Sequence, residues 1–126
     1  MKIPVKTPSH SYAVTIGKGI LREALTAQHD LFTKADKIIV LTDENVWTAQ
    51  QSYFEANFPY TFEVHVMPAG EKCKSFENYN DVQTYLLKQK CTRKSLIIAF
   101  GGGAVGDLAG FVAATYMRGI PFVQVP

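Results

Sequence analysis

The sequence predicts an α/β domain in which a mostly parallel sheet is covered by helices on both faces. Three observations support this fold class. Short apolar segments alternate with segments of helical spacing along the 126 residues. Two of the apolar segments, Ile38–Thr42 and Leu96–Phe100, are continuous rather than alternating, as in parallel strands that are buried on both faces. A glycine cluster directly follows the second segment, at the place where a strand would turn into a helix.

In the first half of the chain, the pattern predicts two strand-and-helix units. Tyr12–Ile16 alternates like a strand, and apolar residues then recur at helical spacing over Ile20–Leu25. Ile38–Thr42 is predicted to be a buried strand. Asp43–Asn45 is then expected to open a helix that continues to Phe54.

The middle of the chain repeats this order. Thr61–Met67 is predicted to be a third strand, and Pro68–Glu71 has the composition of a turn. Ser75 is a good N-cap for a helix that extends to Leu87.

The last unit carries the most informative motif. Leu96–Phe100 is expected to lead through the glycine cluster into a helix over Val105–Met117, followed by a strand over Phe122–Val125. Within the cluster, three glycines match G-x-G-x-x-G, a pattern of dinucleotide sites when it joins a strand to a helix; they are Gly101, Gly103 and Gly106. Residues without a Cβ let backbone N–H groups approach an anion, and the following helix directs its positive end to the same spot. The alternative is a glycine corner that only packs tightly.

Asp107 and the sequence after it limit the dinucleotide interpretation. The usual motif expects an acidic residue about twenty positions further on, where it holds a ribose. No acid follows Asp107 in this chain, so a ribose-binding carboxylate would have to come from upstream. Asp107 itself can alternatively be an acid in the first helical turn that complements the helix dipole.

Three loops are expected to meet at one edge of the sheet, because ligands of parallel α/β sheets gather at the carboxyl ends of the strands. These are the segment after Ile38–Thr42, the Pro68–Lys74 loop and the glycine turn. Asp43 and Asn45 can hold ribose or adenine edges, whereas Glu71 and Lys74 can contact ribose or phosphate. The alternatives stay open: Asp43 or Asn45 can simply cap a helix, and the other two can be an exposed charge pair.

Composition excludes several classes of function. With 13 basic and 11 acidic residues and a net charge of +2, we expect no nucleic-acid partner. No segment approaches the ~20 apolar residues of a membrane span, and no secretory signal is present, so we expect no membrane partner and a cytoplasmic protein. The two cysteines, Cys73 and Cys91, lack metal-ligand spacing, and the three histidines, His10, His29 and His65, are scattered. We therefore expect no metal site and no catalytic residue in this chain.

The run from Gly101 to Pro121 closely resembles the signature of the 3-dehydroquinate synthases. Supporting segments are Tyr12–Gly19, Thr42–Val46 and Pro68–Lys74. The resemblance covers the whole chain but only about the first third of the family's length.

This resemblance implies a Rossmann-like fold and an NAD-binding domain over residues 1–126. A C-terminal domain that binds metal and substrate would be absent from this chain, and the fragment would be inactive alone. The family acts in the shikimate pathway, which leads to chorismate and the aromatic amino acids. Using bound NAD catalytically, it converts 3-deoxy-D-arabino-heptulosonate 7-phosphate, a small sugar phosphate, to 3-dehydroquinate and phosphate. A divalent metal, zinc or cobalt, would be held by ligands outside this chain, and the enzyme would be a homodimer.

The resemblance also implies site residues at the matched positions. Those that would bind NAD are Asp43, Glu44, Asn45, Glu71, Lys72, Cys73, Lys74, Gly102, Gly103, Ala104 and Asp107. Arg118 would bind substrate, and a guanidinium suits phosphate or carboxylate. Its alternative is a charge that complements a helix C-terminus.

Other classes remain as alternatives. Glycerol and iron-dependent alcohol dehydrogenases share a Gly-Gly-Gly turn followed by Asp, although the continuation over Asp107–Phe111 favours the synthase. A different sugar-phosphate cyclase is a second alternative. A non-enzymatic α/β domain that binds a nucleotide or a protein partner is a third.

Overall fold

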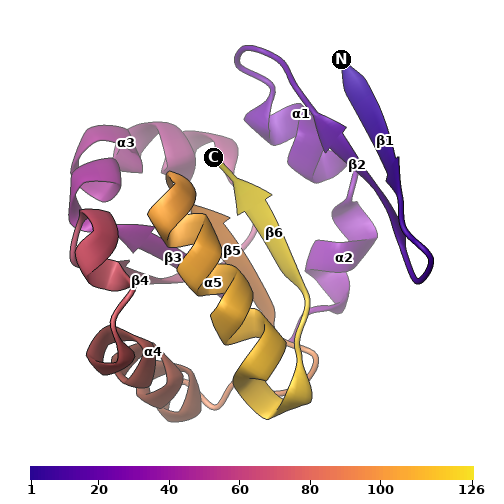
Figure 1. Cartoon of the computed structure of the whole chain (residues 1–126). Coiled ribbons are helices and arrows are strands. Elements are labelled where there is room, and N and C mark those ends of the chain that lie inside the picture. The colour runs from indigo at the N-terminus through magenta and orange to yellow at the C-terminus, as the bar shows by residue number, and fades with distance from the viewer.

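The computed structural model describes residues 1–126, and its core is a four-stranded parallel sheet (Figure 1). The strands are β1 (Lys2–Lys6), β2 (Ser11–Thr15), β3 (Ile38–Asp43), β4 (Glu63–Met67), β5 (Leu96–Phe100) and β6 (Phe122–Val125). The α-helices are α1 (Leu21–Thr26), α2 (His29–Lys34), α3 (Glu44–Asn57), α4 (Phe76–Lys88) and α5 (Gly103–Thr115), with 3₁₀ turns η1 (Gly70–Cys73) and η2 (Tyr116–Arg118). The sheet has the order β4-β3-β5-β6, and all its neighbouring strands are parallel.

The two central strands are the continuous apolar segments of the sequence. Every residue of β3 and of β5 is buried, and the two strands pair directly, from Ile38 opposite Leu96 to Thr42 opposite Phe100. The edge strand β6 alternates between exposed and partly buried residues, and β4 is exposed or partly buried except at Met67. The predicted mostly parallel α/β fold is therefore confirmed.

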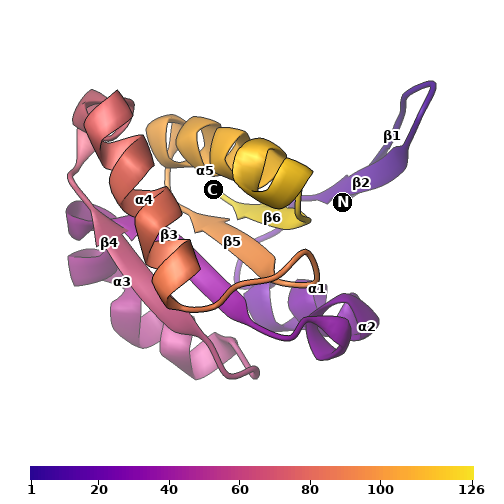
Figure 2. The same cartoon turned by 90° about the horizontal axis from the view of Figure 1, so that it is seen from below.

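Helices cover both faces of the sheet (Figure 2). Helices α4 and α5 pack on the face that presents Ile39, Leu41 and Ile97, where they form the larger apolar cluster. Helices α1, α2 and α3 lie on the other face, where Phe54 and Phe100 belong to a second, aromatic-rich cluster. Since each face of β3 and β5 has its own apolar layer, these strands are held rigidly between them.

The N-terminal segment differs from the prediction. The strand expected over Tyr12–Ile16 is present as β2, but it does not join the parallel sheet. It pairs antiparallel with β1, which the sequence analysis did not predict, and the two form a separate hairpin. Its residues are almost all exposed. The alternating pattern of β2 fits an antiparallel strand outside the core better than a strand buried on both faces.

Helix boundaries follow local capping. The Ser75 hydroxyl accepts a hydrogen bond from the N–H of Asn78 at 3.0 Å, so the predicted N-cap of α4 is confirmed. Helix α5 begins two residues before the predicted Val105 and ends at Thr115. It ends early because Met117 and Arg118 have φ of 47° and 68°, which no α-helix accommodates.

No helix of the chain has the length and apolar character that crossing a membrane needs.

Gly101 fixes the turn from β5 into α5. Its φ is +154°, and a Cβ at this position would lie 2.9 Å from Cγ2 of Val105. Gly102 and Gly103 have negative φ or lie in the helix, and a Cβ at either would meet no atom within 4 Å. Only the first of the three consecutive glycines is therefore required by the fold itself.

These glycines give a stability test. We expect Gly101→Ala to destabilise the chain by about 1–3 kcal/mol, because it combines an overpacked contact with a disfavoured φ. Gly103→Ala is the matched control and should be neutral or stabilising by up to about 1 kcal/mol, because alanine is the better helix former. Urea unfolding followed by circular dichroism measures both. Equal destabilisation by the two variants would contradict this account of the turn.

Candidate functional site

The carboxyl edge of the sheet brings together the three segments that the sequence analysis expected there. Strand β3 ends at Asp43, opposite Met67 at the end of β4. From Met67 the chain continues through η1, which packs against α5. The glycine turn follows β5 at the same edge. We call this group of residues, Asp43–Asn45, Glu71–Lys74, Gly102–Ala104 and Asp107, the rim.

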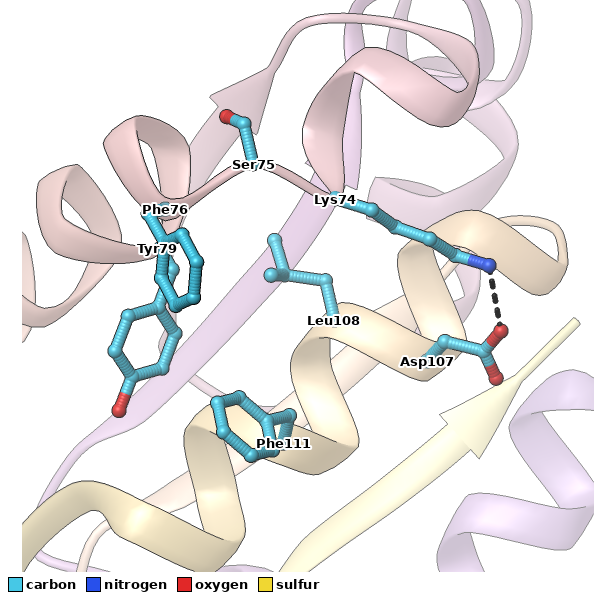
Figure 3. Close-up of a pocket in the computed structure, with 7 residues that line it drawn as sticks. All are labelled: Lys74, Ser75, Phe76, Tyr79, Asp107, Leu108 and Phe111. Carbon is cyan, nitrogen blue, oxygen red and sulfur yellow. Dashed lines mark ion pairs between the residues drawn. The ribbon is translucent and has the colours of Figure 1, made fainter.

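Lys74 is the charged centre of the rim. Its Nζ lies 2.9 Å from Oδ2 of Asp107 and 3.3 Å from Oε2 of Glu71, and Figure 3 shows the ion pair with Asp107. The hydrogen bonds to Asp107 and then to Glu71 raise the pKa of the Lys74 ammonium above its ordinary value. The predicted charge pair of Glu71 with Lys74 is thus present, and Asp107 extends it to a second element. Asp107 is the fifth residue of α5, so it does not lie in the first helical turn.

The start of α5 leaves its backbone open. Gly102 is the N-cap and no side chain caps the helix, so the first N–H groups have no acceptor within it. Gly102 and Gly103 are exposed, with open space where a Cβ would stand. This end of the helix can therefore take an anion that approaches the backbone closely.

Cys73 is the buried member of the rim. Its side chain is fully buried, and the thiol donates to the backbone oxygen of Ala104 at 3.4 Å. Burial raises the pKa of the Cys73 thiol, and the charges of Glu71 and Asp43 raise it further. The thiol is neutral and joins η1 to α5. A direct side-chain contact between Cys73 and a ligand on the rim is not supported by this geometry.

Asp43 has a structural role that is visible without a ligand. It is 9% exposed, and its Oδ1 accepts a hydrogen bond from the N–H of Val46 at 2.8 Å, so it caps α3 as the alternative interpretation held. Glu44 and Asn45 follow in the first turn of α3 and are exposed. A carboxylate and an amide at this edge can accept or donate hydrogen bonds to hydroxyl groups of a ligand.

Arg118 is not brought to the rim. Helix α5 has 13 residues and is therefore about 20 Å long, and Arg118 follows its far end. The N–H of Ile97, near the start of β5, bonds to the backbone oxygen of Pro121, which places this segment at the amino edge of the sheet. Arg118 is exposed. Its predicted role toward substrate stays a prediction, and it is separate from the rim.

A shallow cavity of about 260 Å³ lies beside the rim between α4 and α5 (Figure 3). It shares Lys74 and Asp107 with the rim, and its other side is largely apolar. The lining residues are Lys74, Ser75, Phe76, Tyr79, Asp107, Leu108 and Phe111. Phe76, the first residue of α4, is 90% exposed. The cavity therefore extends the rim with an apolar surface.

The chain holds no group of three or more His, Cys, Asp or Glu side chains that could bind a metal ion. His65 lies in β4, where burial lowers its pKa.

Comparison with known proteins identifies the family. Residues 64–126 match the family model described as the N-terminal domain of 3-dehydroquinate synthase. Over its whole length, the chain is 61% identical to the 3-dehydroquinate synthase of Lysinibacillus sphaericus. The matched part makes up 35% of that protein. The chain thus spans about a third of the length of the curated relatives it matches.

Solved structures show the same fold. The crystal structure of 2-deoxy-scyllo-inosose synthase superposes with a TM-score of 0.86 at 21% identity, over 100% of this chain and 36% of that one. The 2-epi-5-epi-valiolone synthase of Streptomyces hygroscopicus, solved with NAD⁺ and Zn²⁺ bound, gives a TM-score of 0.76 at 26% identity, over 97% of this chain and 34% of that one. The chain therefore belongs to the 3-dehydroquinate synthase family, as the N-terminal part of its members.

Proposed function

We propose that residues 1–126 are the NAD-binding domain of an enzyme with 3-dehydroquinate synthase activity. The observation that carries this proposal is the open, uncapped start of α5 at Gly102 and Gly103. It lies beside Lys74 and its two carboxylate partners. In a chain of this family, that arrangement provides N–H donors for a pyrophosphate and carboxylates for ribose hydroxyls.

The residues present fit a dinucleotide. The space where a Cβ of Gly102 or Gly103 would stand is open, so a pyrophosphate can approach the unpaired N–H groups at the start of α5. Lys74 can exchange a carboxylate partner for a phosphate oxygen, because it is exposed. Asp43 at the end of β3, with Glu44 and Asn45 at the start of α3, can hold a ribose or the adenine edge. Lys72 is exposed in η1 and adds positive charge.

A related cyclase supports the choice of cofactor, since 2-epi-5-epi-valiolone synthase was solved with NAD⁺ and Zn²⁺. When bound, NAD supplies reversible hydride transfer. The residues of this chain bind the cofactor, orient it across the carboxyl edge and do not themselves move protons. A metal does not fit this chain, which offers no ligand cluster, so its ligands would come from the remainder of a full-length enzyme.

We further propose the substrate and assembly of the whole enzyme on the strength of the family match. The substrate is 3-deoxy-D-arabino-heptulosonate 7-phosphate, the products are 3-dehydroquinate and phosphate, and the enzyme is a cytoplasmic homodimer. Arg118, exposed and without an acidic partner, would bind the phosphate or carboxylate of the substrate. The likeness to 2-deoxy-scyllo-inosose synthase, at 21% identity, concerns the fold alone.

Cofactor binding is tested by an amide NMR titration of this chain with NAD. We expect shifts concentrated at the rim, above all over Gly102–Asp107 and at Glu71 and Lys74. Gly103→Val should fold but lose NAD binding, because its side chain would occupy the space of the pyrophosphate. A folded Gly103→Val variant with unchanged affinity would refute the role of the turn, and a wild-type chain without shifts would refute NAD binding by this domain.

The role of Lys74 is tested by comparing Lys74→Ala with Lys72→Ala. Only Lys74 forms ion pairs with Asp107 and Glu71, so we expect its loss to weaken NAD binding by about tenfold or more, as for one charge-assisted hydrogen bond. Lys72→Ala should weaken NAD binding by a factor several times smaller than Lys74→Ala does. Isothermal titration at two salt concentrations measures both, and equal effects would show that only the summed charge matters.

Substrate choice is tested in a chimera that joins this chain to the remaining two thirds of the Lysinibacillus sphaericus relative. We expect release of phosphate from 3-deoxy-D-arabino-heptulosonate 7-phosphate without net formation of NADH. Arg118→Ala should raise KM for substrate and leave NAD affinity unchanged. Net accumulation of NADH would favour a dehydrogenase, and turnover of a hexose phosphate instead would favour another cyclase.

A further inference from the structure

We propose that Asn78 is a positioning residue for the rim: its buried amide fixes η1 so that Lys74 reaches Asp107 on α5. The inference rests on the proposed NAD-binding function, because it assigns Asn78 a part in shaping that site without touching the ligand.

Asn78 closes the loop that carries Glu71 and Lys74. It is 6% exposed, and its Nδ2 donates to the backbone oxygen of Cys73 at 2.8 Å. The same Nδ2 lies 3.4 Å from Sδ of Met67. Met67 ends β4 and Cys73 ends η1, so a single side chain holds both ends of the Pro68–Lys74 loop.

The loop has other anchors, but they are less specific. The Lys74 N–H donates to the backbone oxygen of Glu71 at 3.0 Å, and the buried Cys73 packs in the apolar cluster beneath α5. The thiol of Cys73 reaches the backbone oxygen of Ala104 at 3.4 Å, but a thiol is a weak donor. The amide of Asn78 therefore makes the stronger of the two buried side-chain hydrogen bonds at the end of η1.

That restraint acts directly on Lys74. Lys74 follows Cys73 in the chain, so the position of the Cys73 carbonyl sets where the lysine side chain starts. Its Nζ must reach Asp107 on a different element at 2.9 Å. Without the amide, the Cys73 carbonyl would be left buried and unpaired, and η1 would move to find water. Such a movement separates Lys74 from α5.

The matched pair of variants is Asn78→Leu and Ser95→Ala. Leucine is close in size to asparagine but donates no hydrogen bond. Ser95 is also buried, at 1% exposure, and its hydroxyl donates to Asp36 at 2.7 Å at the amino edge of the sheet, away from the rim. Both variants lose a buried hydrogen bond and should lower the melting temperature. We expect only Asn78→Leu to weaken NAD binding, by about tenfold.

A measurement without NAD decides the inference independently. In Asn78→Leu, amide hydrogen exchange should accelerate over residues 70–74, and the nuclear Overhauser contact between the Lys74 and Asp107 side chains should disappear. Both should persist in Ser95→Ala. If Asn78→Leu does not fold, Asn78→Ser removes the amide with a smaller change in polarity.

The outcomes separate the two proposals. Failure of the wild-type chain to bind NAD would refute the proposed function, and the exchange data would still decide the role of Asn78. A folded Asn78 variant that keeps the loop protected and the Lys74 contact intact would overturn the inference. A folded Asn78 variant that binds NAD as tightly as Ser95→Ala does would also overturn the inference.

Discussion

The site depends on the turn at Gly101, where the fully buried strand β5 leads into the uncapped start of α5. Strand β5 is buried along its length between two apolar layers, so its carboxyl end cannot shift to suit a ligand. The positive φ of Gly101, +154°, lets the chain change direction at this residue. Because Val105 packs against that turn, the direction of α5 is set by the core. The first N–H groups of the helix are therefore held toward the carboxyl edge before any ligand arrives.

The second part of the site is the charged group of Glu71, Lys74 and Asp107. It is held less rigidly than the turn at Gly101. Glu71 and Asp107 are largely exposed and Lys74 is partly exposed, and ion pairs at the surface contribute little to stability. The importance of these groups lies in their placement, because the Lys74 ammonium joins η1 to α5 close to the uncapped start of α5. Buried contacts underneath, from Cys73 to Ala104 and from Asn78 to Cys73, keep these exposed groups together. A rigid backbone thus carries a charged surface that can exchange partners.

Much of this could be predicted from the sequence, because the signals are local. Ile38–Thr42 and Leu96–Phe100 are apolar without interruption, and Ser75 is a capping residue three positions before a helical N–H. Convergence of Asp43, the η1 loop and the glycine turn follows from the rule that parallel strands share their carboxyl edge. The ion pair of Lys74 with Asp107 joins residues far apart in the sequence, so it leaves no local pattern. The β1–β2 hairpin is local, but the sequence analysis predicted only its second strand.

Arg118 and Gly103 are both assigned to function by the resemblance, but the fold places them at opposite ends of α5. Only Gly103 therefore belongs to the rim of this chain. Glycine is a poor helix former, and at Gly103 neither its φ nor its surroundings require it. At Gly101 both do. The fold therefore requires the glycine at position 101 but not the one at position 103, and the proposed approach of a pyrophosphate would account for the second.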